Sequence, residues 1–123
     1  MMRRRWFVLG VLPLVLAVAL AALAPAAFGT SSAKYTVTAL DFKYKLLPLQ
    51  LKAGKQTLTV INRGQATHDF KIGNKAKSWK TRILNPGQRQ TITVTLKKGV
   101  RYTYLCTVPG HATLGMKKTV LVR

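Results

Sequence analysis

The sequence predicts an all-β protein, a Greek-key antiparallel β-sandwich of seven or eight strands over residues 34–123. Short runs of alternating apolar and polar residues recur along this region, with turn residues between them. No window of eleven or more residues in it shows the period of an amphipathic helix. A long uncharged stretch near the start sets residues 1–33 apart as a separate segment, expected to be helical.

Each predicted strand is a run rich in β-branched or aromatic residues that ends at a turn signal. In the clearest run, Ile92, Val94 and Leu96 point one way and the threonines between them point the other. Pro48 interrupts another run and makes it an edge strand, and the lysine-rich stretch 73–80 is expected to be a loop. The predicted strands are 35–42, 46–51, 56–61, 67–72, 89–96, 100–106 and 117–122.

The first 33 residues have the pattern of an export segment. Three arginines at positions 3–5 precede 28 residues without an ionisable side chain, and A-x-A sites allow cleavage before Ala27 or Lys34. The apolar part, residues 6–23, is also about long enough to cross a bilayer. A cleaved signal peptide and a retained membrane anchor both remain open. Either one places residues 34–123 outside the cytoplasm, in the periplasm or the extracellular space.

Composition excludes several classes of function. The chain has 21 Lys+Arg against 2 Asp+Glu, a net charge of +19, of which residues 34–123 retain +16. Two carboxylates cannot build a carboxylate-rich calcium or magnesium site, and one cysteine excludes an internal disulfide and a Cys₄ zinc site. The charge favours acidic partners or an anionic membrane surface. Trp79 lies among lysines, but we expect a solvated basic loop there and no nucleic-acid partner, because an exported domain seldom meets nucleic acid.

The residues that carry chemistry lie near the C-terminus. Cys106 ends a predicted strand, Pro109 and Gly110 bend the following loop to bring back His111, and a second bend returns Met116. A thiolate, an imidazole and a weak thioether form half of a blue copper site. The missing second imidazole has one source, His68, so the predicted metal ligands are His68, Cys106, His111 and Met116. Met116 as an ordinary core residue, with copper held by three ligands, is the alternative for that position.

These segments resemble the cupredoxins, the small blue copper proteins that include plastocyanin, azurin and auracyanin. The stretch from Tyr104 to His111, with Gly115-Met116, is similar to the ligand loop of that family, and its four-residue Cys–His gap is of the auracyanin and azurin type. Residues 62–70 resemble the upstream histidine segment. The resemblance implies a cupredoxin-like domain over 34–123 that binds one copper ion of type 1.

One position departs from the family pattern. The residue after the first histidine is commonly Asn in plastocyanin and azurin, and here it is Asp69. An ionised carboxylate has no N–H to donate. We therefore expect Asp69 to accept hydrogen bonds instead, from the Thr107 hydroxyl or from backbone amides next to Cys106, and to hold the two ligand segments together.

The expected function is electron transfer without enzymatic activity, because such a site suits one-electron chemistry and has no open position or general base. The resemblance implies a surface His111 ringed by Val108, Pro109, Ala112 and Leu114. The partners would be acidic redox proteins met transiently by a monomer. An extracytoplasmic copper carrier that uses the same ligands, and a copper-free binder of polyanions or membranes, are the two alternatives.

Overall fold

The structure is a computed structural model that describes residues 10, 22, 24, 32–47 and 49–123. Within these residues the chain forms eight β-strands and no helix, as predicted for an all-β protein. The strands are β1 (Ala33–Leu40), β2 (Lys43–Leu47), β3 (Gly54–Asn62), β4 (Lys71–Gly73), β5 (Ser78–Lys80), β6 (Arg89–Leu96), β7 (Arg101–Leu105) and β8 (Lys117–Leu121).

The expected N-terminal signal or anchor segment falls almost wholly outside the described residues. In the part of the chain that the structure does describe, no helix has the length and apolar character that crossing a membrane requires.

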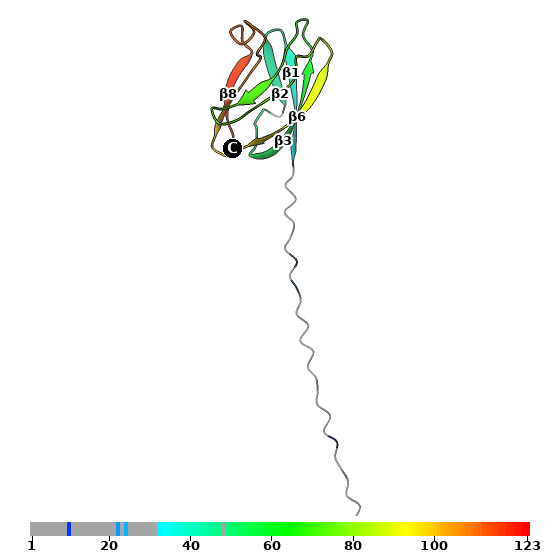
Figure 1. Cartoon of the computed structure of the whole chain (residues 1–123), viewed down its shortest axis with the longest axis vertical. Helices are drawn as coiled ribbons and strands as arrows, with labels where there is room; N and C mark the ends of the chain where they lie inside the picture. Colours follow the sequence, from blue (N-terminus) through cyan, green and yellow to red (C-terminus); the bar gives the residue numbers. More distant parts are fainter. Residues whose placement is uncertain (1–9, 11–21, 23, 25–31, 48) are drawn as a thin grey trace, which may run out of the picture.

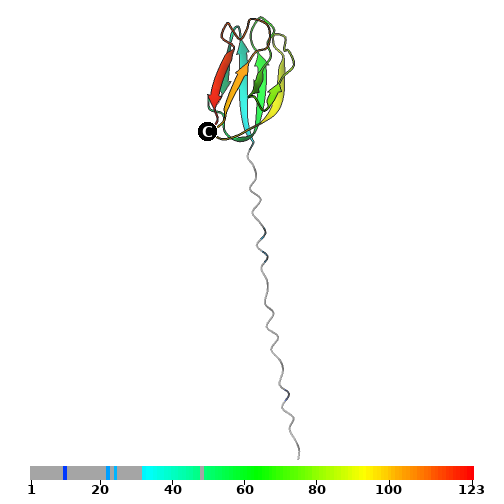
Figure 2. The ribbon, with the colours of Figure 1, turned by 60° about the vertical axis from the view of Figure 1, so that its left-hand side comes forward.

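The eight strands make two four-stranded sheets, in the orders β2-β1-β3-β6 and β5-β4-β7-β8. The chain leaves the first sheet after β3, returns to it with β6, and leaves it again for β7 and β8. This exchange between sheets confirms the Greek-key sandwich, whose strands run along the long axis of the domain (Figures 1 and 2).

One pair of neighbouring strands is parallel, which differs from the wholly antiparallel sandwich expected. Strand β1 pairs with β2 in antiparallel fashion through the turn at Asp41-Phe42, and pairs with β3 in parallel, Val37 opposite Val60. The chain changes direction a second time between β2 and β3. Strand β3 therefore runs in the direction of β1 and lies on the side of β1 that β2 leaves free.

Three of the predicted elements were wrong, beyond the shifts of one or two residues at the ends of the other strands. The predicted strand 46–51 is replaced by β2, which ends at Leu47, although it does lie at a sheet edge. The lysine-rich stretch 73–80 is not all loop, because its last three residues form β5 and pair with β4. His68 lies in an isolated bridge with Leu84 instead of in a continuous strand, and β4 begins only at Lys71.

The inner faces of the two sheets meet in one hydrophobic core. The alternation in β6 is as predicted, since Val94 and Leu96 are buried, and Tyr102 and Tyr104 of β7 are buried as well. Trp79 is half-buried and packs against this core, with the Lys77 Nζ 5.1 Å from its ring centroid. A second, smaller cluster lies beside the main one and consists of Ala39, Cys106 and Met116.

Candidate metal centre

The loop that follows β7 carries three of the four predicted ligands. Its backbone closes on itself, because the amide of Cys106 donates to the carbonyl of Met116 at 3.0 Å and the amide of Met116 donates to the carbonyl of His111 at 3.1 Å. Gly110 and Gly115 have φ angles of 82° and 132°, a region that side chains disfavour. These contacts fold residues 106–116 into a compact loop at one end of the sandwich.

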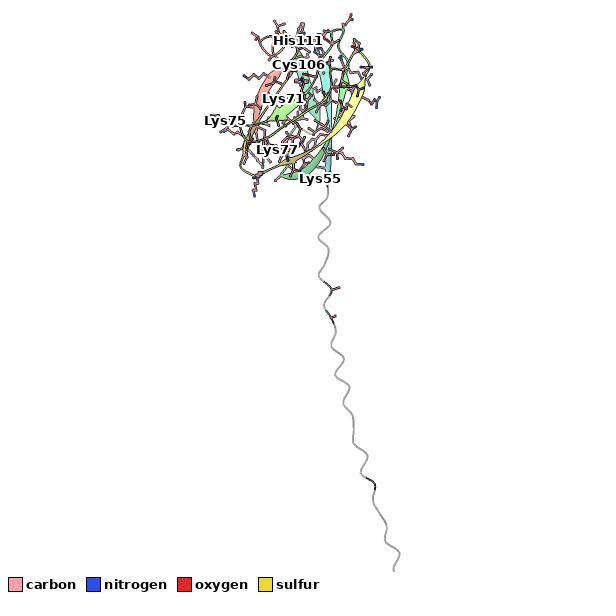
Figure 3. The ribbon with its side chains drawn as sticks, viewed as in Figure 1. Lys55, Lys71, Lys75, Lys77, Cys106 and His111 are labelled. Carbon is pink, nitrogen blue, oxygen red and sulfur yellow. The ribbon has the colours of Figure 1, made fainter. Side chains whose placement is uncertain are left out.

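His68 comes to the same place from a different part of the chain. Its amide and carbonyl both bond to Leu84, at 3.1 and 2.7 Å, and this bridge fixes the backbone ahead of β4. Figure 3 shows His111 and Cys106 at the end of the domain opposite the C-terminus and the start of β1. The structure therefore unites at one end residues that are up to 48 positions apart in the sequence.

The ligand atoms of three residues converge. The two Nδ1 atoms of His68 and His111 are 3.1 Å apart, and the Cys106 Sγ is 3.7 Å from the Nδ1 of His111. All three ligand atoms lie within 4.8 Å of one another. His68 and Cys106 are buried and His111 is half-buried. Two imidazole nitrogens and a thiol gathered in this way form a donor set for a soft or borderline metal ion.

Met116 lies beside these three residues and is fully buried. It packs with Cys106 and Ala39 in the small cluster at this end of the sandwich. Because Met116 packs in the same cluster as Cys106, it completes the arrangement of a type 1 copper site, with two imidazoles, one thiolate and one thioether.

Asp69 joins the two ligand segments as the sequence predicts. Its Oδ1 accepts from the Thr107 amide at 2.6 Å, and its Oδ2 accepts from the Thr107 hydroxyl. The Nζ of Lys80 lies 3.1 Å from the same Oδ2. Burial raises the pKa of Asp69, but the bonds from Thr107 and Lys80 outweigh it and hold that pKa below its usual range. The carboxylate stays ionised, and it joins the segment of His68 to Thr107, the residue after Cys106.

Asp41 is a site residue that the sequence did not reveal. Its Oδ1 lies 2.6 Å from the Nε2 of His68, the ring nitrogen that faces away from the other ligands. The amides of Gln65 and Ala66 also donate to this carboxylate. The hydrogen bond from Gln65, followed by that from His68, lowers the pKa of Asp41. One signal was available, because a buried metal-binding imidazole needs an acceptor for its other nitrogen and only two carboxylates exist in the chain.

Aromatic side chains from the β1–β2 hairpin cover the site, which the sequence also did not reveal. The ring of Phe42 packs edge-on against both imidazoles, with centroid distances of 6.3 Å to His68 and 4.9 Å to His111. The Tyr44 hydroxyl donates to the carbonyl of Asp69. Burial, and then the proximity of Cys106, raises the pKa of Tyr44, so its hydroxyl stays protonated.

The fold and this cluster of donors define a class of protein, the cupredoxins. The chain belongs to the plastocyanin/azurin family of copper-binding proteins, whose family model matches residues 31–123. Its cofactor is accordingly a single copper ion of type 1, and the donor set of the structure fits that ion.

Solved structures of auracyanins have a similar fold. Dithionite-reduced auracyanin from the photosynthetic bacterium Roseiflexus castenholzii has a TM-score of 0.64 and 22% identity, over 75% of this chain and 98% of that one. Auracyanin B has a TM-score of 0.63 and 21% identity, over 74% and 88% of the two chains. Auracyanin A, a "blue" copper protein from the green thermophilic photosynthetic bacterium Chloroflexus aurantiacus, has a TM-score of 0.62 and 17% identity, over 75% and 99%. No curated protein matches the chain in sequence.

Proposed function

We propose that this protein carries single electrons between redox partners, with copper held by His68, Cys106, His111 and Met116. The observation that carries the proposal is the convergence of three ligand atoms within 4.8 Å at one end of the sandwich. When bound in a site of this kind, copper supplies a one-electron couple between Cu(I) and Cu(II). A reduced partner gives up one electron and an oxidised partner later takes one, so the carrier returns to its starting state.

The protein's own residues supply rigidity and insulation. Cys106, His68 and Met116 are buried and keep water away from their donor atoms. The backbone bonds within the loop and the hydrogen bonds between Asp69 and Thr107 hold the donors in place. A rigid donor set changes little between two oxidation states, which favours rapid electron exchange.

His111 provides the route to a partner. It is the one member of the four that is half-exposed. An apolar rim surrounds it in the sequence, and Leu114 on that rim is 63% exposed. A weakly packed apolar surface suits brief encounters between redox proteins. The rim consists of Val108, Pro109, Ala112 and Leu114.

The charge defines the kind of partner. Residues 34–123 carry a net charge of +16, which attracts acidic redox proteins and an anionic membrane surface. Export by residues 1–33 would bring the domain to such a surface. Strand β1 starts at the end of the sandwich opposite His111, so a retained anchor would leave the copper end facing away from the bilayer (Figures 1 and 3). The rate of association with an acidic partner should fall as ionic strength rises, and a rate that ignores salt would refute the role of charge.

The experiment that tests the function combines a copper titration with a redox assay. The protein is titrated with Cu(II) and followed by visible and EPR spectroscopy, with Cys106→Ser as the control. One equivalent should give an intense blue band that the control lacks, and the loaded protein should then exchange electrons reversibly with a small redox mediator. Fast transfer of copper to an acceptor with little redox activity would favour the copper carrier. If the protein binds no stoichiometric copper but still binds polyanions or anionic vesicles, the copper-free binder would be favoured.

A further inference from the structure

We infer that Asp41 is a positioning residue for copper, which fixes His68 as an Nδ1 ligand and favours the oxidised state of the site. The inference deepens the proposed function and rests on it for the identity of the ligands. Asp41 contacts His68 directly, and backbone amides hold the Asp41 carboxylate in place. Its negative charge should act more strongly on Cu(II) than on Cu(I).

The contact fixes the tautomer of a buried imidazole. The Nε2 of His68 and the Oδ1 of Asp41 are 2.6 Å apart, and His68 is fully buried. A neutral imidazole carries one proton, and a carboxylate can only accept. The proton therefore resides on Nε2, and the lone pair is on Nδ1, the atom that faces His111 and Cys106. Without an acceptor at Nε2, the ring could place its proton on either nitrogen and would be free to turn.

The carboxylate is itself held in place. The amide of Gln65 donates to its Oδ2 at 2.8 Å, and the amide of Ala66 donates to its Oδ1 at 3.2 Å. Both amides belong to the segment between β3 and His68, and Asp41 belongs to the β1–β2 turn. Asp41 thus spans two segments that share no strand pairing at this point, and its orientation toward His68 does not depend on a flexible side chain alone.

Gly64 makes room for the pair. A Cβ atom at this position would overlap the Asp41 Oδ1 and would lie 2.9 Å from the Nε2 of His68. The Gly64 amide is bonded to the Asn62 Oδ1 at 2.8 Å, which fixes the glycine against the pair. Any side chain there would separate the carboxylate from the ring. Gly64 is therefore the position at which the contact can be broken without removing the charge.

The two imidazoles of the site differ in the hydrogen bonding of their Nε2 atoms. Among the described residues, His111 has hydrogen-bond partners only at Nδ1, the metal-facing nitrogen, and none at Nε2. His68 has the carboxylate and is buried, whereas His111 has no acceptor and is half-exposed. The Asp41 contact thus fixes the ring of His68 and leaves His111 as the ligand open to a partner.

The contact should stabilise Cu(II) more than Cu(I). A hydrogen bond to a carboxylate raises the electron density of the ligand, and changing such partners typically costs about 10- to 100-fold in metal affinity. A nearby negative charge interacts more strongly with a divalent than with a monovalent ion. We therefore expect loss of the contact to lower the Cu(II) affinity about tenfold relative to the Cu(I) affinity. A tenfold change in that ratio raises the reduction potential by about 59 mV for a one-electron couple.

Three variants of the full protein separate the contact from the charge. Asp41→Asn removes the charge and keeps the size, and Gly64→Ala keeps the charge and displaces the carboxylate. Thr93→Lys is the matched control, because it makes the same change in net charge on the exposed face of β6. For each protein the Cu(II) and Cu(I) affinities and the reduction potential are measured. The ¹H–¹⁵N spectrum of the Cu(I)-loaded, diamagnetic protein reports whether the His68 Nε2 carries a proton in a strong hydrogen bond.

The expected result is a raised potential and a lowered ratio of Cu(II) to Cu(I) affinity in Asp41→Asn and in Gly64→Ala, with Thr93→Lys like the wild type. The protected Nε2–H resonance should be present in the wild type and shifted or lost in Gly64→Ala. Equal losses of both affinities would make Asp41 only a structural tie and would overturn the inference, as would an unchanged potential. If the wild type binds copper but transfers no electrons, the proposed carrier fails, and the affinity ratio still decides the role of Asp41. A wild type that forms no thiolate–copper band would overturn both.

Discussion

Replacing Asp69 by Ala should destabilise the metal-free protein by about 2 kcal/mol, chiefly because a backbone amide loses its acceptor. The carboxylate of Asp69 is fully buried and accepts two bonds from Thr107, one of them from the backbone N–H at 2.6 Å. A buried donor left without a partner costs about 1–3 kcal/mol. Loss of the bond from the Thr107 hydroxyl adds less to the destabilisation, because Thr107 is half-buried and its hydroxyl can turn toward water.

The ion pair contributes little to this total. The side chain of Lys80 is 46% exposed, so its charge returns to water when Asp69 is removed. Pairs exposed to that degree contribute under about 1 kcal/mol. Lys80→Gln is therefore the control, and it should cost much less than Asp69→Ala. For a domain of this size, a loss of about 2 kcal/mol lowers Tm by roughly 8–16 °C.

The assay is urea unfolding of the metal-free wild type and the two variants, followed by tryptophan fluorescence, with Tm measured on the same samples. A second readout is the Cu(II) affinity, which should fall about 10- to 100-fold in Asp69→Ala because the segments of His68 and Cys106 lose their tie. Equal losses of stability in Lys80→Gln and Asp69→Ala would refute the reasoning, since the ion pair and not the Thr107 amide would then carry the effect.

Three further outcomes follow from the structure. The stability advantage of the wild type over Asp69→Ala should be constant above about pH 5 and should shrink as pH falls. A carboxyl whose pKa is lowered in the folded state stabilises fully only above its unfolded pKa of about 3.9, and the contribution is lost progressively as pH falls through its folded pKa. Urea unfolding of both proteins from pH 7 to 2 measures this difference. Met116→Leu should cost less than about 1.5 kcal/mol, because the volume is kept, yet it should raise the reduction potential, since loss of the thioether disfavours Cu(II); a potential equal to that of the wild type would make Met116 an ordinary core residue. Gly73→Ala should destabilise by about 1–3 kcal/mol, because its Cβ would lie 2.6 Å from the Lys77 carbonyl oxygen, and its copper spectrum should match that of the wild type.

The sequence predicted the sandwich because the information for it is local. Alternation along β6 and β7 identifies which side chains point inward, and it holds without knowledge of the partner strands. The three-residue β5 was not predicted, because Ser-Trp-Lys is too short to show a period and is strand only through its pairing with β4. The parallel pairing of β1 and β3 was not predicted either. It depends on which edge of β1 is occupied by β2, and no pattern in the sequence indicates that edge.

The same division applies to the site. The ligand set could be predicted because its members follow from the chemistry of a thiolate, two imidazoles and a thioether, and Asp69 could be predicted because it adjoins His68 in sequence. Asp41 lies 27 residues from His68, and only the folded hairpin brings the two together. The contact of Phe42 with the ligands could not be predicted either, because Phe42 occupies the same β1–β2 turn as Asp41 and only folding brings that turn over the ligands.

Both acidic side chains of the chain are bonded at the copper site. The chain has 21 basic side chains and 2 acidic ones, and each acidic side chain bonds a different part of this site. Asp41 accepts from the ring of His68, and Asp69, the residue after His68, accepts from Thr107, the residue after Cys106. The many basic residues therefore attract acidic partners, while the two negative charges lie where they offset the charge of a bound cation. A chain with one of these carboxylates moved away from the site would keep its net charge and its attraction for acidic partners, and it would lose the fixed geometry of its ligands.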